Sequence, residues 1–453
     1  MIDFIKQWIK EHPARTAACA GWFQQGCGIF AAIVTIPFIL NKLNPADAGL
    51  WFTFQGILAA VTLTDFGFSF VISRQVAFTL GGNESKEEND FIKTESGWEG
   101  VKTIYRGGKV LFRLITGVGV LLLIILYEGV LPFTKLAVMQ NYLTAIAWYC
   151  LGLSTLILLQ SKIYQAIIDG SGRMYLSKFV IGSFQIINGA LVILVLLIFP
   201  NLPSISIAVL LVSILQYIVL KLITNVVSGG KLKGAHATID KQMVSRLWKI
   251  AAPIGIVNSA SYCINSIQTP LVGVILGAEK VPPYYLAQKI VQVFMMAVVQ
   301  LYQPQLPIFT MDYSKGDYKT AFNRMRRTII VVTGAMAISF IVFYLTSPFI
   351  VKIWVGEGRY VSNDILFLMT IDNIILGSAA VWGQFVLASG RNPFVVFAII
   401  NAVLNLTLAT ILCMKYGLIG LPLSTLICGL LTNYWFNPYH GLKLWKELRK
   451  KSE

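Results

Sequence analysis

The sequence predicts an all-α polytopic membrane protein with about 12 transmembrane helices, arranged as two six-helix lobes that are parallel repeats. Three observations lead to this prediction. Of the 453 residues, 56% are apolar and only 13% are charged, about half the charged fraction of an average soluble protein. The apolar residues form twelve runs of roughly membrane-spanning length. The second half of the chain also weakly repeats the first.

Each apolar run is long enough to cross a bilayer, which takes roughly 20 apolar residues as a helix. The second and eighth runs exceed that length, so we expect a tilt, a bend or a protruding end in each. The twelve predicted helices cover residues 16–40, 49–79, 110–127, 142–168, 176–199, 204–226, 247–276, 284–310, 329–353, 363–389, 394–414 and 417–437.

The internal repeat appears when Pro37 is aligned with Pro270, which also aligns Gln55 with Gln288. Six predicted helices separate the copies. An even number preserves orientation, so the two halves are parallel repeats with an expected cleft between them. The predicted division is a cytoplasmic interfacial segment at 1–15, an N-lobe at 16–227, a cytoplasmic linker at 228–245, a C-lobe at 246–438 and a basic cytoplasmic tail at 439–453.

Basic residues indicate the orientation of the chain. Of the 37 Lys and Arg residues, 27 fall on one side of the predicted helices and 6 on the other. Basic connections stay in the cytoplasm, so both termini are predicted to be cytoplasmic. The net charge of +16 is scattered between apolar runs and therefore does not indicate a nucleic-acid partner.

Both ends of the chain have amphipathic patterns. Apolar residues within 2–9 and within 442–448 share one helical face opposite lysines. Such helices can lie on an anionic membrane surface. Solvated tails that only fix the topology are the alternative.

Several classes of chemistry are excluded by the residue pattern. The six cysteines lie in apolar runs without CxxC pairs, and the three histidines lie in polar connections, so no disulfide framework, metal site or cofactor is indicated. No phosphate-binding loop of the GxxxxGK[ST] type occurs. The longest external connection is 128–141, which argues against a membrane glycan polymerase or ligase, and we expect a protein that is not an enzyme.

Short motifs along the whole chain are similar to those of a known transporter family. They begin with Leu43-Asn44-Pro45-Ala46-Asp47-Ala48-Gly49-Leu50-Trp51, Asp65-Phe66-Gly67-Phe68 and Ile72-Ser73-Arg74-Gln75-Val76-Ala77. Later stretches are Gln165-Ala166, Gly170-Ser171-Gly172-Arg173, Ala388-Ser389-Gly390-Arg391, Asn405 and Tyr416-Gly417-Leu418-Ile419-Gly420. Together they resemble the polysaccharide or O-antigen (Wzx-type) flippases of the multidrug/oligosaccharidyl-lipid/polysaccharide (MOP) exporter superfamily.

The resemblance implies a MATE/MOP-like fold. It also implies a flippase that moves undecaprenyl-pyrophosphate-linked oligosaccharide across a bacterial inner membrane by alternating access. Lipid II flippases of that superfamily carry two further C-terminal helices. Because this chain ends after twelve, we expect an O-antigen or capsule repeat unit as substrate. The partners implied are the lipid-linked oligosaccharide, membrane lipids and glycan polymerase or assembly proteins.

Candidate substrate-binding residues are cations and amides within or beside the predicted helices. Lys289 lies about 9 Å into the eighth helix at 1.5 Å per residue. It is placed to meet pyrophosphate, as the resemblance implies, although its long stem could instead let it snorkel outward. Arg74 should reach the cytoplasmic interface. The amide candidates are Gln24, Gln25, Gln300 and Gln303.

Candidate ion-coupling residues lie in the predicted C-lobe. Asp372 should sit near the midplane, where it must be paired, protonated or bound to a cation; Lys289 is one possible partner. Asn401 and Asn405 share a face of the eleventh helix, and Asn258 and Thr425 lie on neighbouring helices. Related proteins place an acid in the asparagine pair, so ordinary interhelical hydrogen bonding is equally open. Coupling to Na⁺ or H⁺ rests on the resemblance.

Asp65 and Gly67 match the family motif and are assigned a gating or structural role. Asp65 and Arg74 point to opposite sides of one helix and cannot pair. Trp22, Trp148 and Trp382 could line a sugar-binding cleft, but packing explains them equally well. A cation-coupled multidrug antiporter of the same fold is the alternative function, and a glycan polymerase or ligase is the second alternative.

Overall fold

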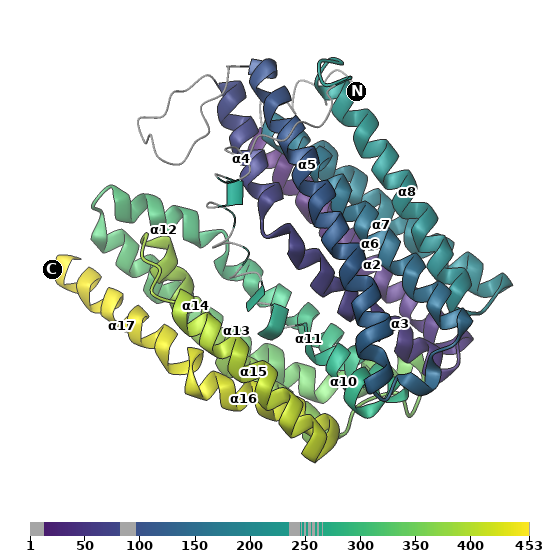
Figure 1. Cartoon of the computed structure of the whole chain (residues 1–453). Helices are drawn as coiled ribbons and strands as arrows, with labels where there is room; N and C mark the ends of the chain where they lie inside the picture. The colour runs from purple at the N-terminus through teal and green to yellow at the C-terminus, as the bar shows by residue number, and fades with distance from the viewer. Residues whose placement is uncertain are drawn as a thin grey trace. The chain divides into compact units, whose positions relative to one another are not determined.

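The protein is helical throughout the part of the chain that the computed structural model describes. Described are residues 13–81, 97–234 and 266–452, together with 245, 247–248, 251, 255, 259–260 and 262–264. Within these residues no strand occurs. The chain divides into two compact units, Met1–Ser259 and Ala260–Glu453, whose helices are labelled in Figure 1.

Unit 1 holds seven helices among its described residues. They are α2 (Pro13–Lys42), α3 (Pro45–Val61), α4 (Phe68–Gly81), α5 (Gly97–Ile124), α6 (Tyr142–Ile168), α7 (Met174–Ile198) and α8 (Leu202–Val227). Asparagine side chains cap three of them, because Asn44, Asn141 and Asn201 accept bonds from amides in the first turns of α3, α6 and α8. These caps satisfy backbone donors that a helix start leaves unpaired.

Unit 2 holds eight described helices. They are α10 (Gln268–Leu276), α11 (Val281–Tyr302), α12 (Gln305–Ser314), α13 (Tyr318–Val355), α14 (Asn363–Ala388), α15 (Val395–Tyr416), α16 (Gly420–Leu431) and α17 (Asn433–Ser452). α14 packs against α13, α16 and α17, and α15 packs against α10 and α16. α14 is therefore the helix around which this unit is built.

Nine helical stretches of the described chain are long and apolar enough to cross a membrane. Two of them, Tyr142–Ile198 and Val395–Lys451, have 57 residues each, nearly three times what one crossing needs. Each contains more than one predicted helix. The predicted helix at 247–276 lies partly outside the described residues. The stretches confirm a multi-pass membrane protein.

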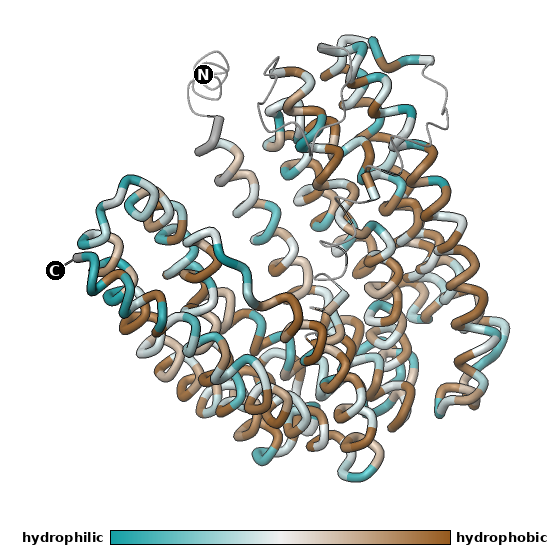
Figure 2. Tube along the Cα trace, turned by 60° about the vertical axis from the view of Figure 1, so that its left-hand side comes forward, coloured by the Kyte–Doolittle hydropathy of each residue, from teal (hydrophilic) through white to brown (hydrophobic). Residues whose placement is uncertain are grey.

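Large apolar side chains on the outside of the helices agree with a lipid environment. On α13, Ile338, Leu345 and Ile353 are 67%, 68% and 71% exposed. A soluble protein would rarely expose such a series, whereas lipid is a favourable environment for it. Figure 2 shows the hydrophobic residues running along the helices, and a hydrophilic end of the chain at the C-terminus.

The predicted helix at 49–79 is broken. α3 ends at Val61, a short 3₁₀ turn covers Thr62–Asp65, and left-handed residues follow at Phe66 (φ 45°) and Gly67 (φ 78°) before α4 begins. The length of this run predicted a tilt, a bend or a protruding end, and the structure has a bend; hydropathy does not locate it, since the residues on both sides are apolar. The bend accommodates a segment that is too long for one straight crossing.

The eighth predicted helix also has the bend that its length allowed for, and one connection differs from its prediction. The predicted helix at 284–310 is divided into α11 and α12, with Pro304 at the start of α12. Proline lacks the amide hydrogen that a continuous helix needs. The basic connection at 81–109 is shorter than predicted, because α5 already begins at Gly97. Its lysines and arginines after that point are therefore helical.

The basic tail forms α17 and packs on protein. Leu444 and Leu448 are each 1% exposed, and the Trp445 ring lies 5.0 Å from Phe322 of α13. Arg391 donates two hydrogen bonds to Glu447, of 3.1 and 2.8 Å. The apolar face that was predicted to lie on the membrane is thus covered in part by α13 and α14, while Leu442 at its start stays 46% exposed. The amphipathic N-terminal segment lies outside the described residues.

Close packing in unit 1 depends on a glycine between α6 and α7. A Cβ atom at Gly170 would lie 2.4 Å from the carbonyl oxygen of Ser73 and 2.7 Å from Cβ of Val76. The carbonyl belongs to the α4 backbone and cannot rotate away. Gly170 therefore allows α4 to approach the bend between α6 and α7.

We predict that Gly170→Ala lowers the thermal stability of the detergent-solubilised protein, because overpacking costs about 1–3 kcal/mol. Gly117→Ala is the matched control, since a Cβ there meets nothing within 4 Å and alanine favours the helix. Size-exclusion thermostability assays on both variants check this. Equal melting temperatures would contradict the packing assignment.

Candidate functional site

The most deeply buried acid of unit 2 is Asp372, which is 6% exposed. It is the tenth residue of α14, about 14 Å along the helix. Its carboxylate accepts a short hydrogen bond from the hydroxyl of Tyr434 on α17. A neutral hydroxyl group therefore donates to this buried acid. A buried polar group needs such a hydrogen bond, because leaving it without one costs free energy.

A second group of polar side chains lies near Asp372. The Gln268 side-chain oxygen accepts from Tyr284 and, at 2.8 Å, from the Gln288 amide. Thr269 donates to the other side of Gln288 at 2.7 Å. Tyr284 is close enough to Asp372 to experience its charge. The hydrogen-bonded group Gln268, Thr269, Tyr284 and Gln288 thus joins α10 to α11 inside the unit.

Asn401 and Asn405 lie on α15 and are 4% and 1% exposed. Their side-chain oxygens have no hydrogen-bond partner among the described residues. A buried amide oxygen without a partner is costly and is a possible ligand for a cation or a water molecule. Asn373, beside Asp372, instead donates to the Met369 carbonyl at 2.8 Å.

Asp372, Asn401 and Asn405 all lie in unit 2, but no hydrogen bond joins the acid to either asparagine among the described residues. The carboxylate of Asp372 is hydrogen-bonded to Tyr434. Lys289 is not its partner, so the pairing that the sequence left open does not occur. Asn258 lies outside the described residues. Among the residues that the structure describes, no three His, Cys, Asp or Glu side chains gather as a metal site would require.

Lys289 is half-buried in α11. Its ammonium group donates to Gln292 at 3.2 Å and lies 5.2 Å from the Tyr285 ring centroid. Within the described chain it forms no ion pair. A cation in a membrane-spanning helix is thus held by an amide and an aromatic face, which leaves its charge uncompensated.

The amide candidates follow Lys289 along α11. Gln300 is eleven residues further on, about 20° around the helix, and is exposed together with Gln292. Gln303 is the residue that follows α11 and is also exposed. The half-buried Lys289 and the exposed Gln300 therefore lie on the same face of α11.

The candidates of unit 1 lie on α2 and α4. Gln24 is half-buried and Gln25 is exposed. Arg74 is exposed, and its guanidinium lies 5.7 Å from the Phe78 ring. Asp65 is 6% exposed, and one carboxylate oxygen lies 2.9 Å from the ammonium of Lys162 on α6.

Asp65 also determines how α4 begins. Its carboxylate accepts bonds from the Ser69 amide at 3.2 Å and the Ser69 hydroxyl at 2.7 Å. The buried Gly67 supplies the left-handed backbone between them. The ion pair with Lys162 was missed by the sequence analysis, because 97 residues separate the partners.

Of the three tryptophans that could line a sugar-binding cleft, Trp148 is instead a packing residue. It is fully buried, donates to the Leu123 carbonyl at 3.1 Å and packs edge-on against Phe54 at 5.0 Å. Trp382 packs against Trp445 of α17 at 5.7 Å. Trp22 is 67% exposed.

The structure also groups cations of unit 1 that the sequence leaves scattered. The ammonium of Lys109 lies 4.3 Å over the Tyr105 ring and within Coulombic range of Arg113 and Lys221. The sequence shows only that Arg113 and Lys221 fall within or at the ends of apolar runs, which does not indicate that they form a group with Lys109. Their proximity to Lys109 depends on how α5 packs in the bundle and is not visible in hydropathy.

Comparisons with known proteins identify the fold. No family model matches the sequence, and no curated protein does. An inward-facing multidrug resistance MATE family transporter of the MOP superfamily matches with a TM-score of 0.68 at 11% identity, over 96% of this chain and 100% of that one. The lipid II flippase MurJ in an inward closed conformation matches with 0.66 at 14%, over 95% and 90%.

An outward-facing MATE family transporter of the MOP superfamily also matches, with a TM-score of 0.59 at 12% identity over 97% of each chain. At such identities the likeness concerns the fold alone. The chain has the fold shared by MATE transporters and MurJ, which confirms the predicted MATE/MOP-like, all-α architecture.

Proposed function

We propose that this protein is a flippase that moves a lipid-linked oligosaccharide with a pyrophosphate headgroup across the bacterial inner membrane. One observation carries the proposal: Lys289 has an amide and an aromatic ring as partners but no carboxylate in the described chain. The buried acids Asp65 and Asp372 are both engaged by other side chains. The uncompensated charge on α11 is therefore positive, which suits an anionic headgroup.

The physical task of such a flippase is to replace water around the headgroup. Transferring ionised phosphates into hydrocarbon without partners would cost far more than thermal energy supplies. Cations and amide donors along the path remove that barrier. We assign this role to Lys289 and Arg74 for the phosphates. The amides assigned to the path are Gln24, Gln25, Gln300 and Gln303.

Alternating access is the proposed mechanism. It is supported by the likeness to MATE family transporters in both inward-facing and outward-facing conformations. Asp65 and Gly67 lie at the break between α3 and α4, where a small change of backbone angles would move α4. We therefore retain a gating role for them.

A cation-coupled multidrug antiporter is the second candidate. Its support is the likeness to multidrug MATE transporters and the buried acid Asp372. A cationic drug needs an accessible acid, however, and Asp372 is 6% exposed and already accepts the Tyr434 hydroxyl. The polymerase or ligase alternative finds no support in the fold, because the similar structures named above are transporters and a flippase.

The proposed orientation places both termini, and the connection between α12 and α13, in the cytoplasm. Four basic residues lie in the first ten residues of α13, which is typical of a cytoplasmic end. A single cysteine introduced at Lys319 should resist an impermeant maleimide in intact cells and react after permeabilisation. Labelling in intact cells would overturn the orientation.

We predict that Lys289→Ala abolishes translocation of the lipid-linked oligosaccharide, while Lys289→Arg retains part of it, because the requirement is for positive charge. Lys280→Ala is the matched control, since Lys280 is an exposed residue just before α11. Translocation in proteoliposomes at equal protein amounts measures this. Full activity of Lys289→Ala would mean that the lysine only snorkels to the interface.

Asp372 is the proposed site where an ion or proton biases the two conformations, with Asn258, Asn401 and Asn405 as further candidates. A potential of 100 mV is worth about 2.3 kcal/mol per charge and, with the interior negative, already favours outward movement of an anion. Coupling would therefore mainly reset the empty carrier.

We accordingly predict that Asp372→Asn slows gradient-driven turnover and leaves substrate affinity nearly unchanged. Asp364→Asn serves as control, because Asp364 is exposed in the first turn of the same helix. Turnover with and without an imposed gradient, alongside equilibrium substrate binding, separates the two effects. An equal loss of binding would make Asp372 a substrate ligand or a structural partner.

A further inference from the structure

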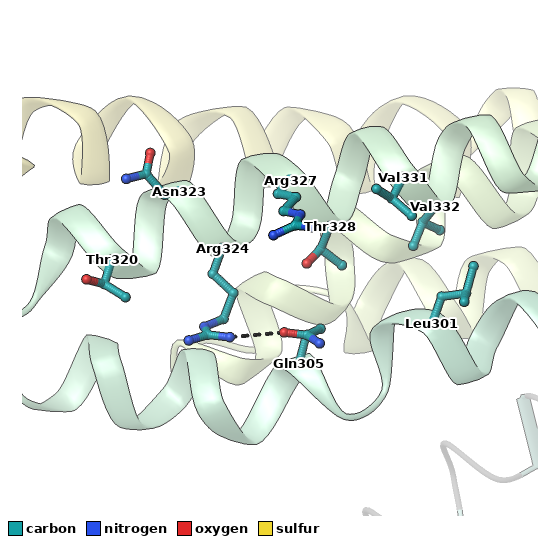
Figure 3. Close-up of a pocket in the computed structure, with 9 residues that line it drawn as sticks. All are labelled: Leu301, Gln305, Thr320, Asn323, Arg324, Arg327, Thr328, Val331 and Val332. Atoms are coloured by element: carbon teal, nitrogen blue, oxygen red, sulfur yellow. Dashed lines mark hydrogen bonds between the residues drawn. The ribbon is translucent and has the colours of Figure 1, made fainter.

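A cavity of about 520 Å³ lies in unit 2 between the end of α11, α12 and the first turns of α13. Figure 3 shows Arg324 reaching from α13 toward Gln305 of α12. Arg327, one turn further along α13, also lines the cavity. None of the transport candidates discussed above lines it. Its volume falls within the range of cavities that bind small molecules.

The charge of the cavity comes from two arginines, of which one is neutralised. The Arg324 guanidinium lies 2.9 Å from Asp312 and donates to Gln305 at 3.0 Å. Arg327 forms no ion pair or hydrogen bond with any residue in the described ranges. The two arginines and Asp312 therefore leave one net positive charge beside the cavity.

The cavity lies where α13 changes from polar to apolar. All four cations in the first part of α13 come before Thr328, and the helix then continues without a charged residue to Val351, about 36 Å at 1.5 Å per residue. This length is enough to cross the hydrocarbon core. The polar lining residues thus lie at the membrane interface, whereas Leu301, Val331 and Val332 line the side toward the hydrocarbon.

We propose that this cavity binds an anionic phospholipid, with the phosphate at Arg327 and Arg324 and an acyl chain against Leu301, Val331 and Val332. A phosphodiester carries one negative charge and matches the single net positive charge, whereas a pyrophosphate would remain under-compensated. Arginine is suited to phosphate because its planar donors bind two oxygens at once. The apolar lining explains why a lipid fits better than free phosphate.

Native mass spectrometry of the full-length protein in detergent tests the proposal with phosphatidylglycerol as probe. We expect Arg327→Ala to weaken binding about tenfold, as loss of a charge-assisted hydrogen bond would. Arg326→Ala is the matched control, because it removes the same charge from the neighbouring residue, which does not line the cavity. Val331→Trp fills the apolar side and should also lose the lipid, although both arginines remain.

Three competing probes separate the sources of phosphate. Glycerol phosphate, which lacks acyl chains, should not displace phosphatidylglycerol, and phosphatidylethanolamine should bind more weakly because its ammonium faces arginines. Equal lipid binding by Arg327→Ala and Arg326→Ala would overturn the proposal, as would displacement by glycerol phosphate. Preferential binding of undecaprenyl pyrophosphate at this cavity would assign it to transport instead. These measurements need no translocation and are independent of the proposed function.

Discussion

A charge inside a membrane needs a partner, and this constraint organises both units. An ionised side chain at the bilayer centre costs about 2.5–3.5 kcal/mol on insertion scales. Asp65 is paired with the ammonium of Lys162, and Asp372 accepts a hydrogen bond from the hydroxyl of Tyr434. Lys289 has only the amide of Gln292 and the ring face of Tyr285 as partners. The protein thus satisfies these acids internally and keeps a cation that can meet an anion from outside.

The same polar contacts also connect distant parts of each unit. The Asp65–Lys162 pair ties the break before α4 to α6, across 97 residues of sequence. The Asp372–Tyr434 bond ties α14 to α17, across 62 residues. Since hydrocarbon gives little apolar driving force for helix association, such bonds and close glycine contacts as at Gly170 hold the helices together. Asn401 and Asn405 are among the buried polar residues of the described chain whose side-chain oxygens have no partner, and a bound ion would explain this pair.

Hydropathy predicted the helices well where one apolar run makes one helix. The helix at 142–168 has the predicted bounds, and Asn141 with Thr144 forms its capping box. Hydropathy could not locate the break at Phe66 and Gly67, because the break depends on backbone angles. It also could not show that Leu448 of α17 is buried against protein, because lipid and the protein interior are equally apolar. Likewise, Lys289 could be singled out from the sequence, but the partners Lys162 and Tyr434 could not, because packing alone brings them to their acids.

The central claim is that the uncompensated cation serves an anionic lipid headgroup. Its most direct test is reconstitution of the purified protein into vesicles that contain fluorescent undecaprenyl-pyrophosphate-linked oligosaccharide. We expect an impermeant quencher to reach nearly the whole labelled pool when the protein is present and only the outer leaflet when it is absent. If quenching is the same with and without protein, while a cationic dye crosses only in its presence, the account is contradicted and the multidrug function replaces it.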